Sequence, residues 1–365
     1  MNPHALMKSN PIRSLRGKIC AQALPLLLAL ATVGGVLPAP AFSATTVRVE
    51  NVRRAFHNGE HNAFTDLIRW KGKFWLAFRS SRDGHGENAN GSIIILSSAD
   101  AKTWDQVHRF SVKGRDTRDP HFLIFGGKLF VYSGTAHIGK EKRRYTDWNA
   151  HFGYATWTTD GSTWAEPRAL EGTYGHYIWR AATNNGKAYL CARRWRGHEP
   201  AEGRLTMQAA LLESDDGLNW RFAGFLQETH GNETAMLVEP TGEMLSVSRA
   251  SMEASVVGRS QPPYREWTRQ RLDGFIGGPM LARWGDHLLV GGRRMTPAGP
   301  RTTLLWLEGT QLIPFAELPS DGDNSYPGLA DYDDGRKLVS WYSTHEKGPD
   351  GQPITAIYLA DLVKN

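Results

Sequence analysis

The sequence predicts an all-β fold, a β-propeller of six blades, and three observations lead to that prediction. A hydroxyl residue, an aspartate two positions later and a tryptophan four positions after that recur at 98–104, 158–164 and 214–220. Asp100, Asp160 and Asp216 follow one another at intervals of 60 and 56 residues, a spacing typical of repeat architectures. Six hairpin patterns recur along the chain, and the last lacks a strand that the start of the chain can supply.

Each repeat unit begins with an apolar strand, a turn containing Gly or Asn and a second strand, which together read as a β-hairpin. The six predicted pairs of strands are 63–68 and 74–78, 121–125 and 129–132, 177–182 and 188–191, 234–238 and 244–247, 280–283 and 287–290, and 328–332 and 337–341. Residues 47–52 are expected to complete the last unit beside 357–362 and so close the ring, because radial repetition leaves no long open edge. A propeller of seven blades is the alternative.

The aspartate motif is interpreted as structural. Asp and Ser or Thr side chains bond to the backbone of their own turn, and the tryptophan packs between blades. The chemistry is therefore expected elsewhere on the propeller.

Residues 1–44 are typical of a signal peptide. Four basic residues and no acidic ones precede an apolar run at 21–36, and small residues follow at 41–44. The run is shorter than the roughly 20 residues that a spanning helix needs. We expect cleavage after Ala44, export to the periplasm or the medium, and a single propeller domain at 45–365.

Removal of that segment lowers the formal net charge from +6 to +2, which does not support nucleic-acid binding. It also removes Cys20, so Cys191 has no partner for an internal disulfide. The sequence has no HExxH motif and no phosphate-binding glycine loop. We expect a monomer that is not embedded in a membrane, with no cofactor and no catalytic metal; a structural calcium ion is left open.

In a propeller the first strand of each blade lines the channel, and its start lies at the same rim as the end of the second strand. The residues that should meet there are His61-Asn62, Arg118-Asp119, Trp179-Arg180, Asn232-Glu233, Gly278-Pro279, Ser325-Tyr326, 79–82, 193–196, Arg249, Arg293-Arg294 and 342–345. Arginines predominate in this set, and planar guanidinium groups suit carboxylates. The pattern indicates a site for an acidic sugar or another carboxylate.

The aspartate motifs and the segments 232–236 and 242–249 resemble the sialidase (neuraminidase) superfamily of Asp-box, or BNR-repeat, propellers. In that family a glutamate polarises a tyrosine nucleophile, three arginines hold the sialic acid carboxylate and an aspartate donates a proton. The resemblance implies that Glu233 and Tyr326 are the catalytic pair and that Arg249 and Arg301 bind the carboxylate. The family's Arg-Ile-Pro signature is replaced by His-Asn-Ala-Phe at 61–64. The candidates for the proton donor are Asp66 and Asp83.

A closer resemblance is to sialidase-like propellers that act on uronic acids, including ulvan lyases and rhamnose–glucuronate lyases and hydrolases. The matching segments are 61–68, 78–86, 118–120, 179–180, 277–279, 326–329 and 343–346. This resemblance implies that His61, His85 and Tyr326 act as acid, base or charge-neutralising groups and that Arg180 binds the uronate carboxylate. Members usually have seven blades and a further arginine in the second blade, for which the candidates here are Arg143, Arg144 and His151.

We therefore expect an exported enzyme that cleaves a glycosidic bond at a sialic or uronic acid within an acidic oligo- or polysaccharide. Hydrolysis would use Glu233 and Tyr326, and β-elimination would use His61, His85 and Tyr326. The alternative is a catalytically inactive propeller that binds carbohydrate.

Overall fold

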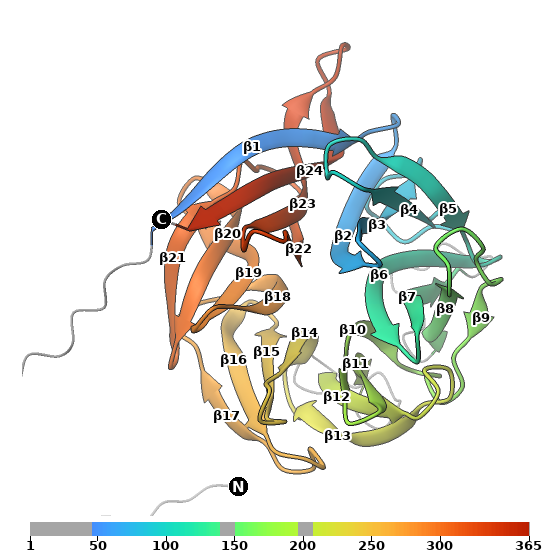
Figure 1. Ribbon diagram of the computed structural model, residues 1–365, viewed down its shortest axis with the longest axis vertical. Helices are drawn as coiled ribbons and strands as arrows, with labels where there is room; N and C mark the ends of the chain where they lie inside the picture. Colours follow the sequence, from blue (N-terminus) through green and yellow to red (C-terminus); the bar gives the residue numbers. More distant parts are fainter. Residues whose placement is uncertain (1–45, 139–149, 196–206, 365) are drawn as a thin grey trace, which may run out of the picture. The chain divides into compact units, whose positions relative to one another are not determined.

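The computed structural model describes residues 46–138, 150–195 and 207–364. These ranges form six antiparallel sheets of four strands, arranged as blades around a centre (Figure 1). The prediction of an all-β, six-bladed propeller is confirmed, and the seven-bladed alternative is not what the structure has. Within the described ranges, no helix is long and apolar enough to cross a membrane.

The blades follow the order of the chain, and each runs from an inner to an outer strand. The first three blades are β2 (His61–Trp70), β3 (Lys73–Ser81), β4 (Ser92–Ser98) and β5 (Asp105–Phe110); β6 (Arg115–Phe125), β7 (Lys128–His137), β8 (Phe152–Thr158) and β9 (Arg168–Ala169); and β10 (Tyr177–Asn184), β11 (Lys187–Trp195), β12 (Met207–Ser214) and β13 (Arg221–Gln227). The next two are β14 (Gly231–Val238), β15 (Met244–Ala250), β16 (Glu253–Ser260) and β17 (Thr268–Arg271); and β18 (Gly277–Trp284), β19 (His287–Thr296), β20 (Gly299–Glu308) and β21 (Gln311–Glu317).

The sixth blade joins the two ends of the propeller. Its inner strands β22 (Ser325–Asp331), β23 (Lys337–Lys347) and β24 (Pro353–Lys364) come from the end of the chain, and its outer strand is β1 (Val47–Phe56). β1 pairs antiparallel with β24, with Val47 opposite Lys364. The predicted completion of this blade by residues 47–52 is confirmed, and the pairing covers an edge that would otherwise be open.

The three Asp…Trp turns share one pattern of hydrogen bonds. Oδ1 of Asp160 accepts from the backbone N–H groups of Ser162 and Thr163, both at 2.8 Å, and Oγ1 of Thr158 accepts from Gly161 N–H at 2.8 Å. The turns at Asp100 and Asp216 repeat these bonds. The side-chain bonds thus satisfy backbone donors within a tight turn, as the structural interpretation requires.

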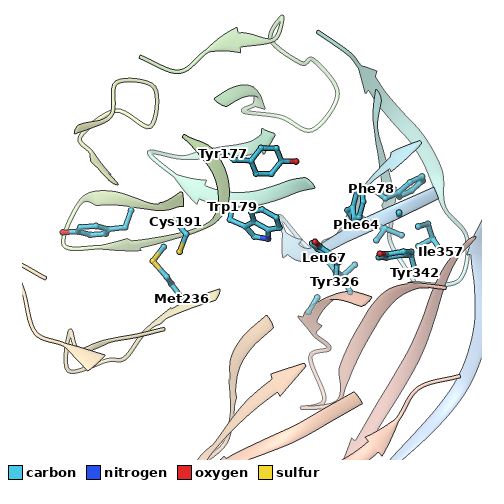
Figure 2. Close-up of a cluster of buried hydrophobic side chains, with 14 of the residues drawn as sticks. Phe64, Leu67, Phe78, Tyr177, Trp179, Cys191, Met236, Tyr326, Tyr342 and Ile357 are labelled. Carbon is cyan, nitrogen blue, oxygen red and sulfur yellow. The ribbon is translucent and has the colours of Figure 1, made fainter. Parts of the chain in front are cut away.

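Two of the three tryptophans of these turns pack between blades. Trp164 of the second blade lies 6.0 Å, ring centre to ring centre, from Trp75 of the first, and Trp220 of the third lies 5.7 Å from Tyr132 of the second. Such edge contacts bury large apolar surfaces and fix one blade against the next. Around the channel, the largest apolar cluster draws side chains from several blades (Figure 2).

The predicted signal peptide and Cys20 lie outside the described residues, and export stays a prediction. Cys191 is buried with a free thiol.

Candidate functional site

Every inner strand has a β-bulge a few residues after its start. The register shifts fall between Ala63 and Asp66, Arg118 and Pro120, Ile178 and Ala181, Gly231 and Thr234, Gly277 and Met280, and Ser325 and Gly328. A bulge re-aims the side chains of the extra residues and is common beside active sites. The six bulges therefore place one ring of re-aimed residues at a single rim.

A pocket of about 420 Å³ opens at this rim. It is lined by Phe64, His85, Gly86, Glu87, Arg118, Asp119, Tyr177, Trp179, Arg193, Glu233, Arg249, Arg293 and Tyr326. Five of these side chains, those of Phe64, Asp119, Trp179, Glu233 and Tyr326, come from the bulges. Four arginines face three carboxyl groups in the lining, so the pocket suits an anionic ligand.

Tyr326 and Glu233 form a hydrogen-bonded pair in the pocket. Oη of Tyr326 donates to Oε1 of Glu233 at 2.7 Å, and both residues are buried. The tyrosine ring also stacks on Trp179, with ring centres 6.0 Å apart (Figure 2). The pair thus joins a phenol to a carboxylate in a fixed orientation.

Other contacts keep Glu233 ionised. Nη1 of Arg249 donates to Oε1 at 2.8 Å, and the backbone N–H of Gly278 donates to Oε2 at 2.7 Å. Burial by itself raises the pKa of Glu233, but Arg249, Tyr326 and Gly278 outweigh it and the pKa lies below its ordinary value. Burial, followed by the charge of Glu233, raises the pKa of Tyr326 well above its ordinary value. Glu233 is therefore a carboxylate that accepts from a neutral phenol.

Position 278 requires glycine. Its φ is +58°, and a Cβ there would lie 2.8 Å from both Oγ of Ser325 and the ring of Tyr326. The close approach brings the Gly278 N–H to Glu233 while leaving room for the tyrosine.

The arginines surround the Tyr326–Glu233 pair. Arg293 donates to the Asn324 carbonyl at 2.6 Å, and Arg193 donates to the Asn232 side chain at 2.9 Å. Nε of Arg249 donates to the Ser251 carbonyl at 3.1 Å. Backbone and side-chain oxygens thus orient guanidinium groups that belong to different blades.

Two carboxyl groups of the pocket lining, those of Asp119 and Glu87, hold protons more strongly than usual. Tyr177 donates to Oδ2 of Asp119, and Oδ1 of Asp119 is buried with no partner among the described residues. Burial raises the pKa of Asp119 although Arg118 opposes it. Desolvation in the pocket raises the pKa of Glu87 as well, against Arg118, although the Glu87 residue as a whole is exposed on its loop. A raised pKa favours the protonated form, in which a carboxyl group can act as a proton donor.

Arg79 holds the loop that carries His85 and Glu87. Its guanidinium is fully buried and pairs with Asp116 through Nε at 3.0 Å and Nη2 at 3.2 Å. It also donates to the carbonyls of Gly84 at 3.0 Å and Gly86 at 3.2 Å. A buried, bidentate ion pair therefore fixes the backbone on both sides of His85.

His61 and His85 meet at one carboxylate oxygen. Nε2 of His61 lies 2.9 Å from Oδ2 of Asp323, and Nδ1 of His85 lies 2.6 Å from the same atom. The His85 side chain is about half exposed and lines the pocket, whereas the His61 side chain is mostly buried and is not part of the lining. Burial lowers the pKa of His61 despite its contact with Asp323.

Comparison with solved structures extends over most of the chain. A protein of unknown function from Dyadobacter fermentans is similar over 87% of this chain and 99% of its own, with 19% identity and a TM-score of 0.72. Trypanosoma rangeli sialidase, in complex with a 2,3-difluoro derivative of KDN, is similar over 87% of this chain, with 14% identity and a TM-score of 0.62. The endosialidase of phage phi92 is similar over 86%, with 11% identity and a TM-score of 0.61.

The fold is that of the sialidases. The chain spans 58% of the length of the Trypanosoma rangeli sialidase chain and 69% of that of the phage endosialidase. No protein-family model matches the sequence, and no curated protein does. The resemblance to uronate-active propellers stays a prediction.

Of the site residues predicted from the sequence, Glu233, Tyr326, Arg249 and His85 line this pocket together. Arg180 does not. Its guanidinium donates to Asp66 at 2.9 Å and to the carbonyls of Pro279 at 3.0 Å and Pro327 at 2.7 Å. The side chain thus ties β10 to β2, β18 and β22 across the channel. The expectation that Arg180 holds a substrate carboxylate stays a prediction.

Arg301 also lies outside the pocket lining, in an ion pair with Asp321 at 2.9 Å. It begins the third strand of its blade, farther from the channel than Arg293 on the second strand. The assignment of Arg301 to the carboxylate stays a prediction, whereas Arg293 lines the pocket.

The two proton-donor candidates lie elsewhere too. Asp66 pairs with Arg180 in the channel, and Asp83 accepts from Asn90 on an exposed loop. Of the candidates for the role of the second-blade arginine, His151 is not part of the pocket lining. Its ring packs against that of Tyr177, which is, with ring centres 4.8 Å apart. Arg143 and Arg144 lie outside the described residues.

Sequence reasoning did not assign roles to several residues of the site. Arg118, Asp119, Arg193 and Arg293 belong to the set that the repeat phase placed at this rim, so the signal for them was present. Glu87 and Asp323 lie on loops between strands, where repeat phase gives no position.

Proposed function

We propose that the protein is a glycoside hydrolase that cleaves the bond to an acidic sugar, with Tyr326 as the nucleophile. The observation that carries this proposal is the 2.7 Å hydrogen bond from Tyr326 to Glu233 inside a pocket lined by four arginines. The sialidase fold supports it, and one structure of Trypanosoma rangeli sialidase is a covalent intermediate with 2,3-difluorosialic acid.

The arginines would bind the sugar carboxylate. A guanidinium group can donate two parallel hydrogen bonds to a carboxylate. Arg249 bonds to Glu233, the partner of Tyr326, and Arg293 bonds to the carbonyl of Asn324, two residues before Tyr326. A substrate carboxylate bound to Arg249 would compete with Glu233 for the positive charge of the guanidinium group, which weakens the Arg249–Glu233 ion pair. Glu233 then becomes a stronger base when the site is occupied.

The chemistry proceeds in two displacements. Oη of Tyr326 forms a bond to the anomeric carbon while Glu233 accepts the phenol proton, the glycosidic C–O bond breaks, and the leaving oxygen takes a proton from Glu87. Water then attacks the anomeric carbon, Glu87 accepts its proton, and the phenolate leaves and recovers its proton from Glu233. The sugar is released with its original anomeric configuration.

A phenol suits this pocket better than a carboxylate nucleophile would. In a sialic acid the carboxylate is attached to the anomeric carbon itself, and a second carboxylate at that point would repel it. A neutral tyrosine avoids this repulsion until Glu233 removes the proton.

The substrate is a sialic acid or a uronic acid. β-Elimination at a uronate is the second candidate, because His85 lines the same pocket as Tyr326. We also propose export through residues 1–44, which would place the enzyme where acidic polysaccharides occur.

Product analysis distinguishes these functions. The wild-type protein is incubated with sialosides and with uronate-containing oligosaccharides, and reducing ends and absorbance at roughly 235 nm, which unsaturated uronates show, are followed together. Hydrolysis gives reducing ends without absorbance, whereas elimination gives both. Sugar binding without either product would contradict the proposal and favour a binding propeller.

A further inference from the structure

A second group of side chains at the same rim has no part in the hydrolysis proposed for Tyr326 and Glu233. It consists of His61 on β2, His85 on the loop after β3, and Asp323 just before β22. We propose that these three residues bind a divalent transition-metal ion of the Zn²⁺ type at the edge of the sugar pocket.

The three donor atoms lie close together, as the ligands of a small metal ion do. Nε2 of His61, Nδ1 of His85 and Oδ2 of Asp323 all lie within 4.8 Å of one another, and the two nitrogens lie 2.9 and 2.6 Å from the carboxylate oxygen. Tetrahedral zinc, with bonds of about 2.0–2.1 Å, places its ligands about 3.3–3.4 Å apart. The two nitrogen–oxygen separations are shorter than that value, so the side chains would move apart to admit an ion between them.

The carboxylate is already oriented as a ligand. Oδ1 of Asp323 accepts from Oη of Tyr342 at 2.9 Å and from Nη2 of Arg293 at 3.3 Å, which leaves Oδ2 toward the two imidazoles. Hydrogen bonds to the distant oxygen of a ligating carboxylate are typical of metal sites. Arg293 thus partly neutralises the negative charge at Oδ1 of Asp323, while Oδ2 stays available to bind a metal ion.

The histidines are held in place as well. The ring of His85 packs edge-on against Phe64 and His61, with ring centres 5.4 and 5.5 Å apart, respectively. His85 also faces the sugar pocket, so a metal ion bound here would keep a position open on that side. A water molecule or an oxygen atom of the bound sugar would fill it.

The donor set selects the class of metal. Two nitrogens and one oxygen suit Zn²⁺ and related ions, whereas Ca²⁺ takes six to eight oxygen ligands. The proposal is independent of the hydrolysis proposed for Tyr326 and Glu233, since none of the three ligands takes part in that reaction.

The test measures metal binding directly. The full chain, purified without a polyhistidine tag and freed of metal by chelation, is titrated with Zn²⁺ by calorimetry and with Co²⁺ by visible absorption. We expect one Zn²⁺ per chain and tetrahedral Co²⁺ bands. His85→Ala and Asp323→Asn should each weaken Zn²⁺ binding by at least about 100-fold, more than the 10- to 100-fold typical of losing an outer partner.

The matched control is His57→Gln, which changes a histidine four residues before His61 and outside the cluster. It should bind Zn²⁺ like the wild type. Equal Zn²⁺ affinity in the wild type and both ligand variants would overturn the proposal, and so would a Zn²⁺ site that Ca²⁺ fills equally well. Because His85 is exposed, its alanine variant is expected to fold even where Asp323→Asn does not.

Discussion

Glu233→Gln is the substitution whose effects the structure defines most closely. The carboxylate accepts from Tyr326, Arg249 and Gly278 at 2.7, 2.8 and 2.7 Å. Glutamine keeps the shape and one oxygen for the Gly278 N–H, but it cannot take the phenol proton. It also leaves the Arg249 charge without its partner.

The expected loss in kcat follows from the missing base. General-base catalysis contributes about 10²- to 10⁴-fold, which corresponds to about 2.7 to 5.4 kcal/mol in the activation free energy. The loss in stability should be smaller, about 1–3 kcal/mol, because neutralising a buried carboxylate removes its desolvation penalty and the Arg249 side chain is 23% exposed.

The assay pairs kcat/KM on an acidic glycoside with thermal unfolding of the same preparation. Glu243→Gln is the matched control: Glu243 pairs with Arg259 at 3.0 Å in the same blade, but both side chains are partly exposed and outside the pocket lining. It should leave turnover unchanged and alter stability by less than about 1 kcal/mol. A folded Glu233→Gln protein whose kcat stays within tenfold of the wild type would refute the proposed role.

Four further predictions concern the pocket and its support. Glu87→Gln should slow natural glycosides by about 10²-fold or more but spare substrates with activated leaving groups. A general acid must be protonated and a general base ionised. Wild-type kcat/KM should therefore fall as pH rises through the raised pKa of Glu87 and as pH drops through the lowered pKa of Glu233. Glu87→Gln should abolish the fall at high pH, and a variant that keeps this fall would contradict the assignment. Arg249→Met should raise KM for an acidic substrate at least tenfold, whereas Arg301→Met, outside the pocket, should leave KM within twofold; equal effects in initial-rate assays would argue against this carboxylate site. Arg180→Met should lower the unfolding temperature with little change in KM, because the side chain bonds only to protein atoms in the described channel; a selective rise in KM would support its expected substrate role. Gly278→Ala should reduce both stability, by about 1–2 kcal/mol for the left-handed backbone alone, and kcat, and an unaltered kcat would show that the close approach to Glu233 is dispensable.

The repeat pattern was sufficient to predict the fold because its signals are local. An aspartate two residues after a hydroxyl residue specifies a turn, and Gly or Asn between apolar runs specifies a hairpin. Counting these units gave six blades, and the missing strand of the last blade pointed to residues 47–52, which the structure confirms.

Repeat phase also predicted which rim collects the polar residues, but not which of two neighbours faces the pocket. Trp179 and Arg180 occupy the same bulge; the tryptophan lines the pocket and the arginine bonds within the channel. Successive residues of a strand point to opposite sides, so an error of one position exchanges the two roles. Glu87 and Asp323 lie on loops, whose residues have no fixed position within the repeat unit, and only the folded chain brings them to the site.

Three residues of the pocket lining have strained backbone conformations. Phe64, Asp119 and Tyr326 have φ values of 61°, 50° and 51°, in the left-handed region that side chains with a Cβ seldom occupy. Such conformations cost about 1–3 kcal/mol each and persist where surrounding packing enforces them. All three line the pocket, and Tyr326 is the proposed nucleophile, so the fold gives up stability at the candidate site.

The most direct test of the central claim compares wild-type protein with Tyr326→Phe on fluorogenic glycosides of sialic acids, uronic acids and neutral sugars. The account predicts release of the fluorophore from an acidic glycoside and not from the neutral ones. It also predicts loss of that activity in Tyr326→Phe, which removes one hydroxyl and leaves the ring packed on Trp179. Wild-type protein that releases fluorophore from no acidic glycoside, or a phenylalanine variant as active as the wild type, would contradict it.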